Sequence, residues 1–387
     1  MNILMLSPVF PFPPDDGDRL RIFYFLKQLS KKHDIYLACF SAPQDEKHVD
    51  ELKKYCAGVS CIPMTKAEIF TKAIESVFSG MPVNAGAYKN KKMRRLVASI
   101  MHIKKIDLIF AYRMRMAQYA EGIEIPKVID IVDSLAFYNQ NRKEFEKNIF
   151  SRIYMAVDGP RILKYEKALS EKFKYVFINS EQDRDFLNGK NIIVVPNGAE
   201  GLKTKKKKNM VFTAGFFGNM AYPPNRDAVL YFIKNIWKKL LNSGDNIKLI
   251  IAGKGSESLN PAFAKASAGK IEIKGYVDDI VKEISSWDLS LVPVRYGAGR
   301  QNKILLSWLA SVPVLATPFA AAGVYGKDIQ NILIAQNEDE FIKKIALIKD
   351  NPKLAKKITA AATKTLKKNF DWKKSAGIIE KYIRKIT

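Results

Sequence analysis

The amino-acid sequence predicts an α/β protein built from two parallel-sheet domains. Its 387 residues are too many for one small core and correspond to two domains of ordinary size. Short apolar segments alternate with helix-like segments along the chain, and this alternation occurs in two series. Continuous apolar strands separated by helices are typical of a parallel sheet that is covered on both faces.

The first series predicts an N-terminal domain over residues 1–200. It opens with the apolar segment NILMLSP, continues as a helix in GDRLRIFYFLKQLSKKH and returns to a strand in DIYLACF. Later strands are predicted in IDLIFAY, PKVIDIVD, YVFINS and IIVVPNG, because each apolar run is closed by polar or turn residues. Basic helices are predicted between these strands at residues 90–105 and 159–173.

A lysine-rich segment, GLKTKKKKN, separates the two series. Its run of lysines has nothing to pack in a core, so residues 201–209 are predicted to be a linker. The second series predicts another domain over residues 210–370, with a helix in NRDAVLYFIKNIWKKLL. Its strands are predicted in MVFTAGFFG, IKLIIAGKG, IEIKGYV, LSLVPV and VPVLATP, and an amphipathic helix, WKKSAGIIEKYIRKI, lies near the C-terminus.

The formal net charge of +25 is compatible with several anionic partners. Nucleic acid, an anionic membrane surface and phosphorylated small molecules all fit, and so does a lysine-rich surface that is merely solvated. No paired CxxC finger or aromatic RNA-binding signature occurs, so we expect no nucleic-acid partner.

The composition also bears on location and metal binding. The sequence has no apolar run of about 18 residues and no basic segment before its apolar start, which predicts a cytoplasmic protein without a signal peptide. Three cysteines without metal-type spacing predict reduced thiols, and three histidines make a histidine-rich metal site improbable.

Ligands of parallel-sheet domains bind outside the carboxyl ends of the strands, so the strand-end loops are the candidates for a site. In the first domain, the loop SPVFPFPPDDGDRLR carries Gly17 just before a helix. In the second, AGFFGNMAYPPN carries Gly218 and Asn219 in the same position. Glycine lets backbone N–H groups approach an anion at a helix N-terminus, although each loop is equally explained as a simple strand–helix turn.

The segment RYGAGRQNK is the richest of these loops. Two glycines precede Arg300, Gln301, Asn302 and Lys303, and the two cations are expected on the first turn of the following helix. Cations at a helix N-terminus oppose the macrodipole at a cost of about 0.3–1 kcal/mol each, which suggests that they serve an anion. A solvated basic turn is the alternative.

Acid and base candidates are few. Asp130 and Asp133 end a predicted strand, and Asp133 is the better catalytic candidate of the two. Both are also explained as caps of the helix that follows. The sequence offers no Ser–His–Asp set, metal cluster or DxD pair as a competitor.

Seven segments carry a family resemblance, in order, across nearly the whole chain. They are PPDDGDRLRIFYFLKQLSKKHDIYLACF, VIDIVDS, GPRILKYEKALSEKF, VFINSEQDRDFL, VVPNGAE, GNMAYPPNRDAVLYFI and GRQNKILLSWLASVPVLAT. Together they resemble the GT-B glycosyltransferases of the family-4 type (group 1). The similarity is strongest to the sugar transferases of bacterial exopolysaccharide and exosortase loci.

The resemblance implies two Rossmann-like domains facing a central cleft, with the C-terminal helix at 371–387 packing back on the first domain. The second domain would bind a nucleotide-diphosphate sugar, and the first would bind a glycan or lipid-linked acceptor. Gly17 would face the donor diphosphate, and Lys303 with Arg300 would neutralise it as it leaves. Asp133 would support the reacting sugar.

Relatives of this type generally retain anomeric configuration and need no metal ion or other cofactor, because protein cations and helix dipoles stabilise the leaving group. Basic helices of the first domain would allow peripheral attachment to the anionic inner face of the membrane.

One departure from the family pattern concerns the nucleotide. Relatives commonly carry a glutamate that binds the ribose, often with another eight residues earlier, whereas this sequence has Leu306 and Ala298. Losing ribose hydrogen bonds costs on the order of 1–3 kcal/mol. A non-catalytic sugar-nucleotide or glycan-binding protein is therefore the alternative function. A GT-B sugar-nucleotide epimerase has less support, because no strand-end carboxylate and histidine set occurs in the second half.

Overall fold

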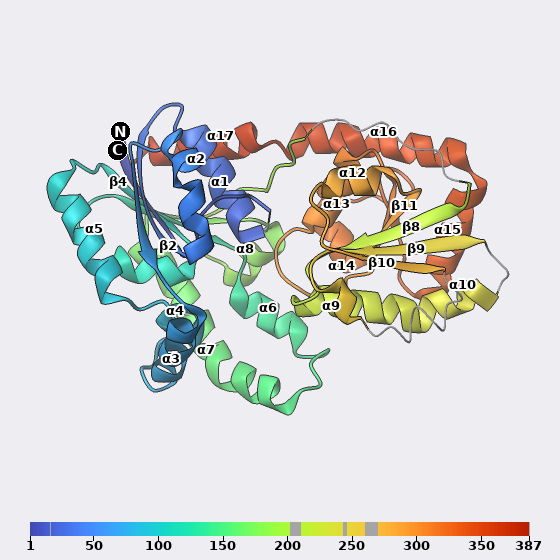
Figure 1. Cartoon of the computed structure of the whole chain (residues 1–387), viewed down its shortest axis with the longest axis horizontal. Coiled ribbons are helices and arrows are strands. Elements are labelled where there is room, and N and C mark those ends of the chain that lie inside the picture. The colour runs from blue at the N-terminus through green and yellow to red at the C-terminus, as the bar shows by residue number, and fades with distance from the viewer. Residues whose placement is uncertain (16, 202–209, 243–245, 260–269, 387) are drawn as a thin grey trace. The chain divides into compact units, whose positions relative to one another are not determined.

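The computed structural model describes residues 1–15, 17–201, 210–242, 246–259 and 270–386 (Figure 1). The chain divides into two compact units. Unit 1 contains Met1–Asn197 and Trp372–Thr387, and unit 2 contains Gly198–Asp371. The predicted linker lies, apart from Gly201, outside the described residues.

Unit 1 is built on a seven-stranded sheet with the strand order β3-β2-β1-β4-β5-β6-β7. All of its neighbouring strands are parallel. The strands are β1 (Asn2–Ser7), β2 (Asp34–Ser41), β3 (Gly58–Pro63), β4 (Leu108–Tyr112), β5 (Lys127–Val132), β6 (Tyr175–Ile178) and β7 (Ile192–Val194). The helices are α1 (Gly17–Leu29), η1 (Pro43–His48), α2 (Val49–Lys53), α3 (Lys66–Val77), α4 (Val83–Gly86), α5 (Lys91–Ile103), η2 (Met114–Tyr119), α6 (Leu135–Arg142), α7 (Ile149–Lys172), α8 (Glu181–Leu187) and α17 (Trp372–Ile383).

The alternation of side chains along β1 shows how the sheet is covered on both faces. Ile3 and Met5 point to one face, where they join a core with side chains of α1 and α17. Leu4 and Leu6 point to the other face, where they join a core with side chains of α5 and α7. Both sets are fully buried, which explains why the strand is a continuous apolar run in the sequence.

Unit 2 repeats the arrangement with a six-stranded parallel sheet in the order β10-β9-β8-β11-β12-β13. Its strands are β8 (Phe212–Phe217), β9 (Ile247–Ala252), β10 (Ile271–Gly275), β11 (Leu289–Val292), β12 (Val314–Ala316) and β13 (Leu333–Ile334). Its helices are α9 (Pro223–Tyr231), the π-helical η3 (Phe232–Trp237), α10 (Lys238–Asn242), η4 (Ser256–Ser258), α12 (Ile280–Ser285), α13 (Asn302–Leu309), α14 (Pro318–Ala322), α15 (Glu338–Asp350) and α16 (Pro352–Asn369). The two sheets confirm the predicted α/β fold class.

The sequence prediction was wrong about the start of one long helix. The helix expected at 159–173 begins at Ile149, because the Asn148 side chain accepts hydrogen bonds from the first-turn N–H groups. Gly159 and Pro160, which are typical of a helix start, lie inside α7. The strands β3 and β13 were also not predicted: β3 is only partly buried, and β13 has two residues.

Candidate functional site

Three glycines stand at the carboxyl ends of neighbouring strands in unit 2. Gly218 follows β8, Gly253 follows β9, and Gly275 ends β10. The Gly253 N–H donates to the Gly275 carbonyl at 2.6 Å, and a Cβ at Gly253 would lie only 2.3 Å from the Gly218 carbonyl oxygen. Gly253 also has a φ of +118°, which disfavours any residue with a side chain. The carboxyl edge of this sheet is therefore lined by closely packed backbone.

The side chain of Lys303 lies beside the first of these glycines. A Cβ added to Gly218 would be 3.0 Å from Lys303 Cε and 2.7 Å from Asn225 Nδ2. Burial lowers the pKa of Lys303 to about 8, and no carboxylate of the described residues forms an ion pair with it. The ammonium lies 5.7 Å from the ring centroid of Phe216. Lys303 is thus a desolvated cation next to the half-buried backbone of Gly218, an arrangement suited to an anionic ligand.

Asn219 shapes the turn that follows Gly218. Its side-chain oxygen accepts a hydrogen bond from the Ala221 N–H at 2.9 Å, and its carbonyl oxygen accepts one from Asn225 Nδ2 at 2.8 Å. The residue therefore holds the loop between β8 and α9 in place. Direct donor binding by Asn219 stays a prediction.

The N-terminus of α13 is the second part of this region. Gln301 is the N-cap, and its side chain makes no capping hydrogen bond, while Asn302 is the first helical residue. An N-terminus without a side-chain cap is suited to an anionic group, because its dipole is positive and its N–H groups point outward. Lys303 is the second residue of the same turn, so its charge adds to that of the dipole.

Arg300 occupies a different position from the one predicted. It precedes the N-cap of α13 and is not on the first helical turn. Its side chain is buried, its Nη1 donates to the Gly323 carbonyl, and its guanidinium lies over the rings of Tyr325 and Phe370 at 5.3 and 5.4 Å. These contacts fix the loop before α13 and leave a donor-binding role for Arg300 as a prediction only.

Leu306 occupies the position where the family resemblance implies a ribose-binding glutamate. It packs at the edge of an apolar cluster that contains Phe217, Trp287 and Ala310. Leu306 therefore has a packing role, as expected of an apolar side chain.

In unit 1, the two aspartates at the end of β5 have different environments. Asp130 is fully buried, and its carboxylate binds the Arg21 guanidinium through Nε at 2.8 Å and Nη2 at 3.2 Å. Arg21 also donates to the Val195 carbonyl and to Asn197 Oδ1. Asp130 is therefore a structural residue, as its complete burial in an ion pair indicates.

Asp133 lies just beyond the strand and is only partly buried. Burial raises the pKa of its carboxyl, although the nearby cations Arg113 and Arg21 oppose this effect. Its Oδ1 atom is buried without a hydrogen-bond partner among the described residues. Asp133 does not cap the next helix, because Ser134 does so by accepting from the Phe137 N–H. The simple capping explanation is thus wrong for both aspartates.

The structure adds Arg113 and Asp18 to the candidates in unit 1. Arg113 follows β4 and forms an ion pair with Asp18 at the start of α1, while its Nη1 lies 4.0 Å from Asp133 Oδ2. Burial alone would raise the pKa of Asp18, but Arg113 and Arg115 hold that pKa below its ordinary value. Arg113 has a φ of +64°, and backbone strain of this kind is concentrated at functional sites. In the sequence, the signal that could have identified Arg113 is a cation directly after a buried apolar strand.

Gly17 is the first residue of α1 and is exposed. A Cβ at this position would meet no atom within 4 Å, so the packing of unit 1 does not require glycine here. Its predicted donor contact is left as a prediction.

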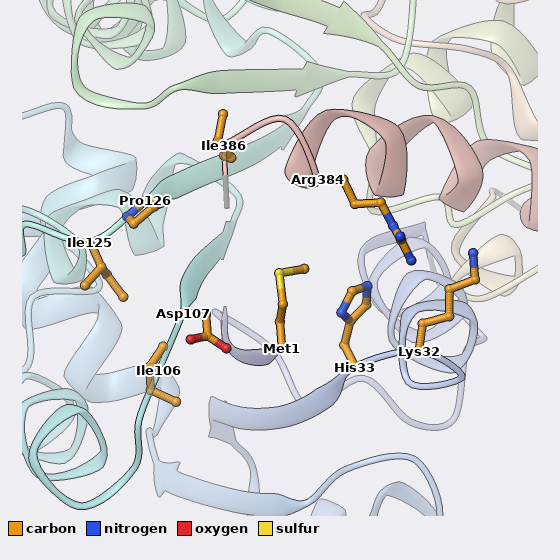
Figure 2. A pocket seen from close by; sticks show the side chains of 9 residues that line it. All are labelled: Met1, Lys32, His33, Ile106, Asp107, Ile125, Pro126, Arg384 and Ile386. Carbon is orange, nitrogen blue, oxygen red and sulfur yellow. The ribbon is translucent and has the colours of Figure 1, made fainter.

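A surface pocket of about 740 Å³ lies elsewhere in unit 1 (Figure 2). His33, Asp107 and Pro126, which line it, each directly precede a strand, so the pocket is at the amino end of the sheet. His33 Nε2 contacts the Glu380 carboxylate at 2.5 Å, and although burial raises the pKa of Glu380, His33 and Arg384 hold it below its ordinary value. The lining contains none of the candidate site residues, and the amino end is not where parallel sheets bind ligands.

Comparisons with known proteins agree with this architecture. The family described as glycosyl transferases group 1 matches residues 211–351, which lie within unit 2. A 44.6 kDa protein of the cps region of Klebsiella pneumoniae is 22% identical and aligns over 96% of this chain and 97% of its own length.

Among solved structures, the sucrose-phosphate synthase of Thermosynechococcus elongatus superposes with a TM-score of 0.71 at 12% identity, covering 100% of this chain and 98% of that one. The HepE protein of Anabaena in complex with UDP superposes with a TM-score of 0.67 at 14% identity and 100% coverage of both chains. The fold and the family match lead to one conclusion. The chain has the GT-B fold, and its residues 211–351 resemble the glycosyl transferases of group 1.

Proposed function

We propose that this protein transfers a sugar from a nucleotide-diphosphate sugar to a glycan or lipid-linked acceptor. The observation that carries the proposal is the position of Lys303, a desolvated cation beside the Gly218 backbone and on the first turn of α13. A diphosphate at this point gains an ion pair with the ammonium and hydrogen bonds from the helix N-terminus. Gln301 and Asn302 belong to the same turn, and Gly218 with Asn219 forms the facing loop.

The proposed reaction breaks the bond between the anomeric carbon and the diphosphate oxygen. The acceptor hydroxyl oxygen forms the new bond to that carbon, and its proton passes to the departing diphosphate. Negative charge grows on the leaving oxygen, so a fixed ammonium and a helix dipole stabilise the transition state more than the ground state. Because the Lys303 ammonium and the helix dipole supply positive charge at the leaving group, we propose that the transfer needs no metal ion. We also propose that it proceeds with retention of anomeric configuration.

For unit 1 we propose a role in binding the acceptor. Asp133 would give electrostatic support to the reacting sugar, held in place by the ion pairs of Arg113 with Asp18 and Asp133. A partly buried carboxylate with a raised pKa next to two cations is a typical feature of a functional site.

The comparisons support a nucleotide donor and a polysaccharide role. The HepE protein of Anabaena has structures in complex with UDP and with UDP-glucose, and the Klebsiella relative is encoded in a cps region. We therefore propose a uridine-diphosphate sugar as the first donor to test and cell-surface or exopolysaccharide synthesis as the pathway.

Calorimetry tests the donor site. The protein is titrated with UDP-, GDP- and dTDP-sugars, and then the Lys303→Ala and Lys343→Ala variants are titrated with the donor that binds. Lys343 is an exposed lysine of α15 and serves as the matched control. Loss of a charge-assisted contact predicts a roughly ten- to hundredfold weaker donor affinity for Lys303→Ala alone. Equal affinity in both variants contradicts the assignment of the site.

The packing of Leu306 favours a second function, which is sugar-nucleotide or glycan binding without catalysis. Both functions predict donor binding, but only the transferase predicts turnover. Slow donor hydrolysis and transfer to acceptor extracts, measured with and without a chelator, separate the two. Anomeric configuration in the product is read by NMR.

A further inference from the structure

The largest exposed apolar side chains of the described residues are concentrated on two helices of unit 1. Nine of the sixteen belong to α3 with the residue after it and to the first half of α7. They are Phe70, Ile74, Val77, Phe78, Ile149, Phe150, Ile153, Tyr154 and Val157. Isolated exposed apolar residues need no explanation, but a cluster of this kind marks an interaction surface.

The spacing of these residues gives each helix an exposed apolar face. On α3, Phe70, Ile74, Val77 and Phe78 follow one another at the i, i+4, i+7 and i+8 positions, which share one side of a helix. Phe78 is 87% exposed, so this side is not covered by the described part of the chain.

The first half of α7 has two apolar faces. Met155 and Ile162 are buried in the unit, whereas Phe150 and Ile153, on another side, are 78% and 55% exposed. The buried face already anchors the helix, and the other face adds little to the packing of unit 1. Selection for stability alone does not account for it.

The two helices are neighbours (Figure 1). Arg161 of α7 donates to the Val77 carbonyl at the end of α3 at 2.9 Å. Asp158 of α7 accepts from the Val83 N–H of α4 at 3.1 Å, and α4 follows α3 in the chain. We define the exposed apolar side chains of α3, α7 and Phe78 as the α3–α7 surface.

A cluster of cations borders this surface. Residues 89–106 contain seven lysines and arginines and no acidic residue. Lys91, Lys92, Arg94 and Arg95, on the first turns of α5, are all exposed. The α4 helix packs against the end of α3, since a Cβ added to Gly86 would lie 2.3 Å from Ser76 Cβ, and Asn90, the N-cap of α5, follows Gly86 by four residues. The basic N-terminus of α5 therefore adjoins the α3–α7 surface.

We propose that the α3–α7 surface docks on an anionic lipid bilayer, with its aromatic and aliphatic side chains inserted at the interface and the α5 cations on the lipid headgroups. Amphipathic helices with large apolar side chains and neighbouring lysines and arginines bind in this way. No helix of the described residues is long and apolar enough to cross a bilayer. The charge pattern favours a bilayer over a second copy of the chain, because two copies of this cationic border would repel each other.

The proposal does not depend on transferase activity and is tested with the full chain alone. Binding is measured by co-sedimentation with vesicles of phosphatidylcholine and phosphatidylglycerol and with vesicles of phosphatidylcholine only. We expect binding to the anionic vesicles. The Phe78→Ser/Phe150→Ser variant should bind them at least about tenfold more weakly. A Tyr276→Ser/Leu347→Ser variant, which changes exposed apolar residues of unit 2, should bind like the parent.

A charge variant tests the cationic border. Replacing Lys91, Lys92, Arg94 and Arg95 by glutamine should weaken binding to anionic vesicles by about fivefold per charge. The matched control replaces four exposed lysines of α16 in unit 2 by glutamine: Lys353, Lys356, Lys357 and Lys364. An equal loss of vesicle affinity in the two variants would show that only the net charge matters. It would overturn the proposal that binding occurs at the α3–α7 surface.

Insertion is read by fluorescence. All four native tryptophans are buried, so a Phe150→Trp variant adds an exposed reporter whose emission should shift to the blue with anionic vesicles. No binding to anionic vesicles, or binding without this shift, overturns the proposal. A self-associated parent that becomes monomeric in the Phe78→Ser/Phe150→Ser variant assigns the surface to a second copy instead. Donor calorimetry on the same variants should give unchanged affinity, so failure here is distinct from failure of the donor site.

Discussion

The Gly218 backbone and the Lys303 side chain are in such close contact that one added carbon on the glycine would lie 3.0 Å from Lys303 Cε. The first residue follows β8 and the second belongs to the first turn of α13, so 85 positions in sequence separate them. The parallel sheet brings both to its carboxyl edge. The contact between Gly218 and Lys303 therefore locates the proposed donor site at one point of this edge.

Substitution of Gly218 by alanine should weaken donor binding. The new methyl group would crowd Lys303 and Asn225, whose flexible ends can move, and the φ of +158° adds backbone strain, so the cation is displaced at some cost in stability. We expect an affinity loss of about tenfold, which is 1.4 kcal/mol, by calorimetry. Gly377→Ala in α17 is the control, because its Cβ would meet open space and should leave donor affinity unchanged. Equal donor affinity in both variants would contradict a binding role for the Gly218 turn.

The pKa of Lys303 gives donor binding a defined pH dependence. Its value of about 8 means that the free protein loses the charge as the pH rises through 8. A bound diphosphate favours the ammonium and raises the pKa, so binding near pH 8.5 should take up a proton. Calorimetry in buffers of different ionisation enthalpy measures this uptake. The Lys303→Arg variant stays charged throughout and should show none, whereas equal uptake in parent and variant would assign the proton to another group.

The lowered pKa of Lys303 also affects the pH dependence of folding stability, in the direction opposite to that of a lysine in a salt bridge. The folded pKa of Lys303 lies below its unfolded value of 10.5, so the unfolded state binds more protons between about pH 8 and 10.5. Stability contributed by this group therefore rises with pH across that window. Urea unfolding of the parent and Lys303→Met variants checks this, and a methionine variant with an unchanged pH slope would exclude Lys303 as the source.

Arg113 should control the ionisation of the unit 1 carboxylates. Its charge opposes the effect of burial on Asp133 and helps to hold the pKa of Asp18 low. Replacing it by glutamine should raise both pKa values, so the acid limb of the pH–rate profile should move to higher pH. Arg113→Lys keeps the charge and should restore most of the profile. A rate that falls equally at every pH would indicate a purely structural role.

The prediction from sequence was most successful for the strands and for the edge of the sheet at which each loop lies. Continuous apolar runs predicted the strands, and the carboxyl-end rule brought Gly218 and Lys303 into consideration. It favoured Asp133 over Asp130 but could not show that Asp130 is held in a buried ion pair, because the partner, Arg21, is 109 residues from Asp130 in sequence. Likewise, Arg300 became a packing residue through Tyr325 and Phe370, and these contacts leave no local pattern.

The C-terminal helix α17 should stabilise unit 1 and not the unit that precedes it in sequence. Ile379 of α17 is fully buried in a core with side chains of α1 and β1, and Trp372 stacks on Tyr24 with ring centroids 4.8 Å apart. An Ile379→Ala substitution removes buried methyl groups and leaves a cavity, which should cost about 2–5 kcal/mol. Hydrogen exchange read by mass spectrometry separates the units: peptides from β1 and β4 should lose protection while those from β8 and β9 keep it. Ile378→Ala, at a partly buried neighbour, should have a smaller effect. Loss of protection confined to β8 and β9 would show that the helix stabilises unit 2 instead.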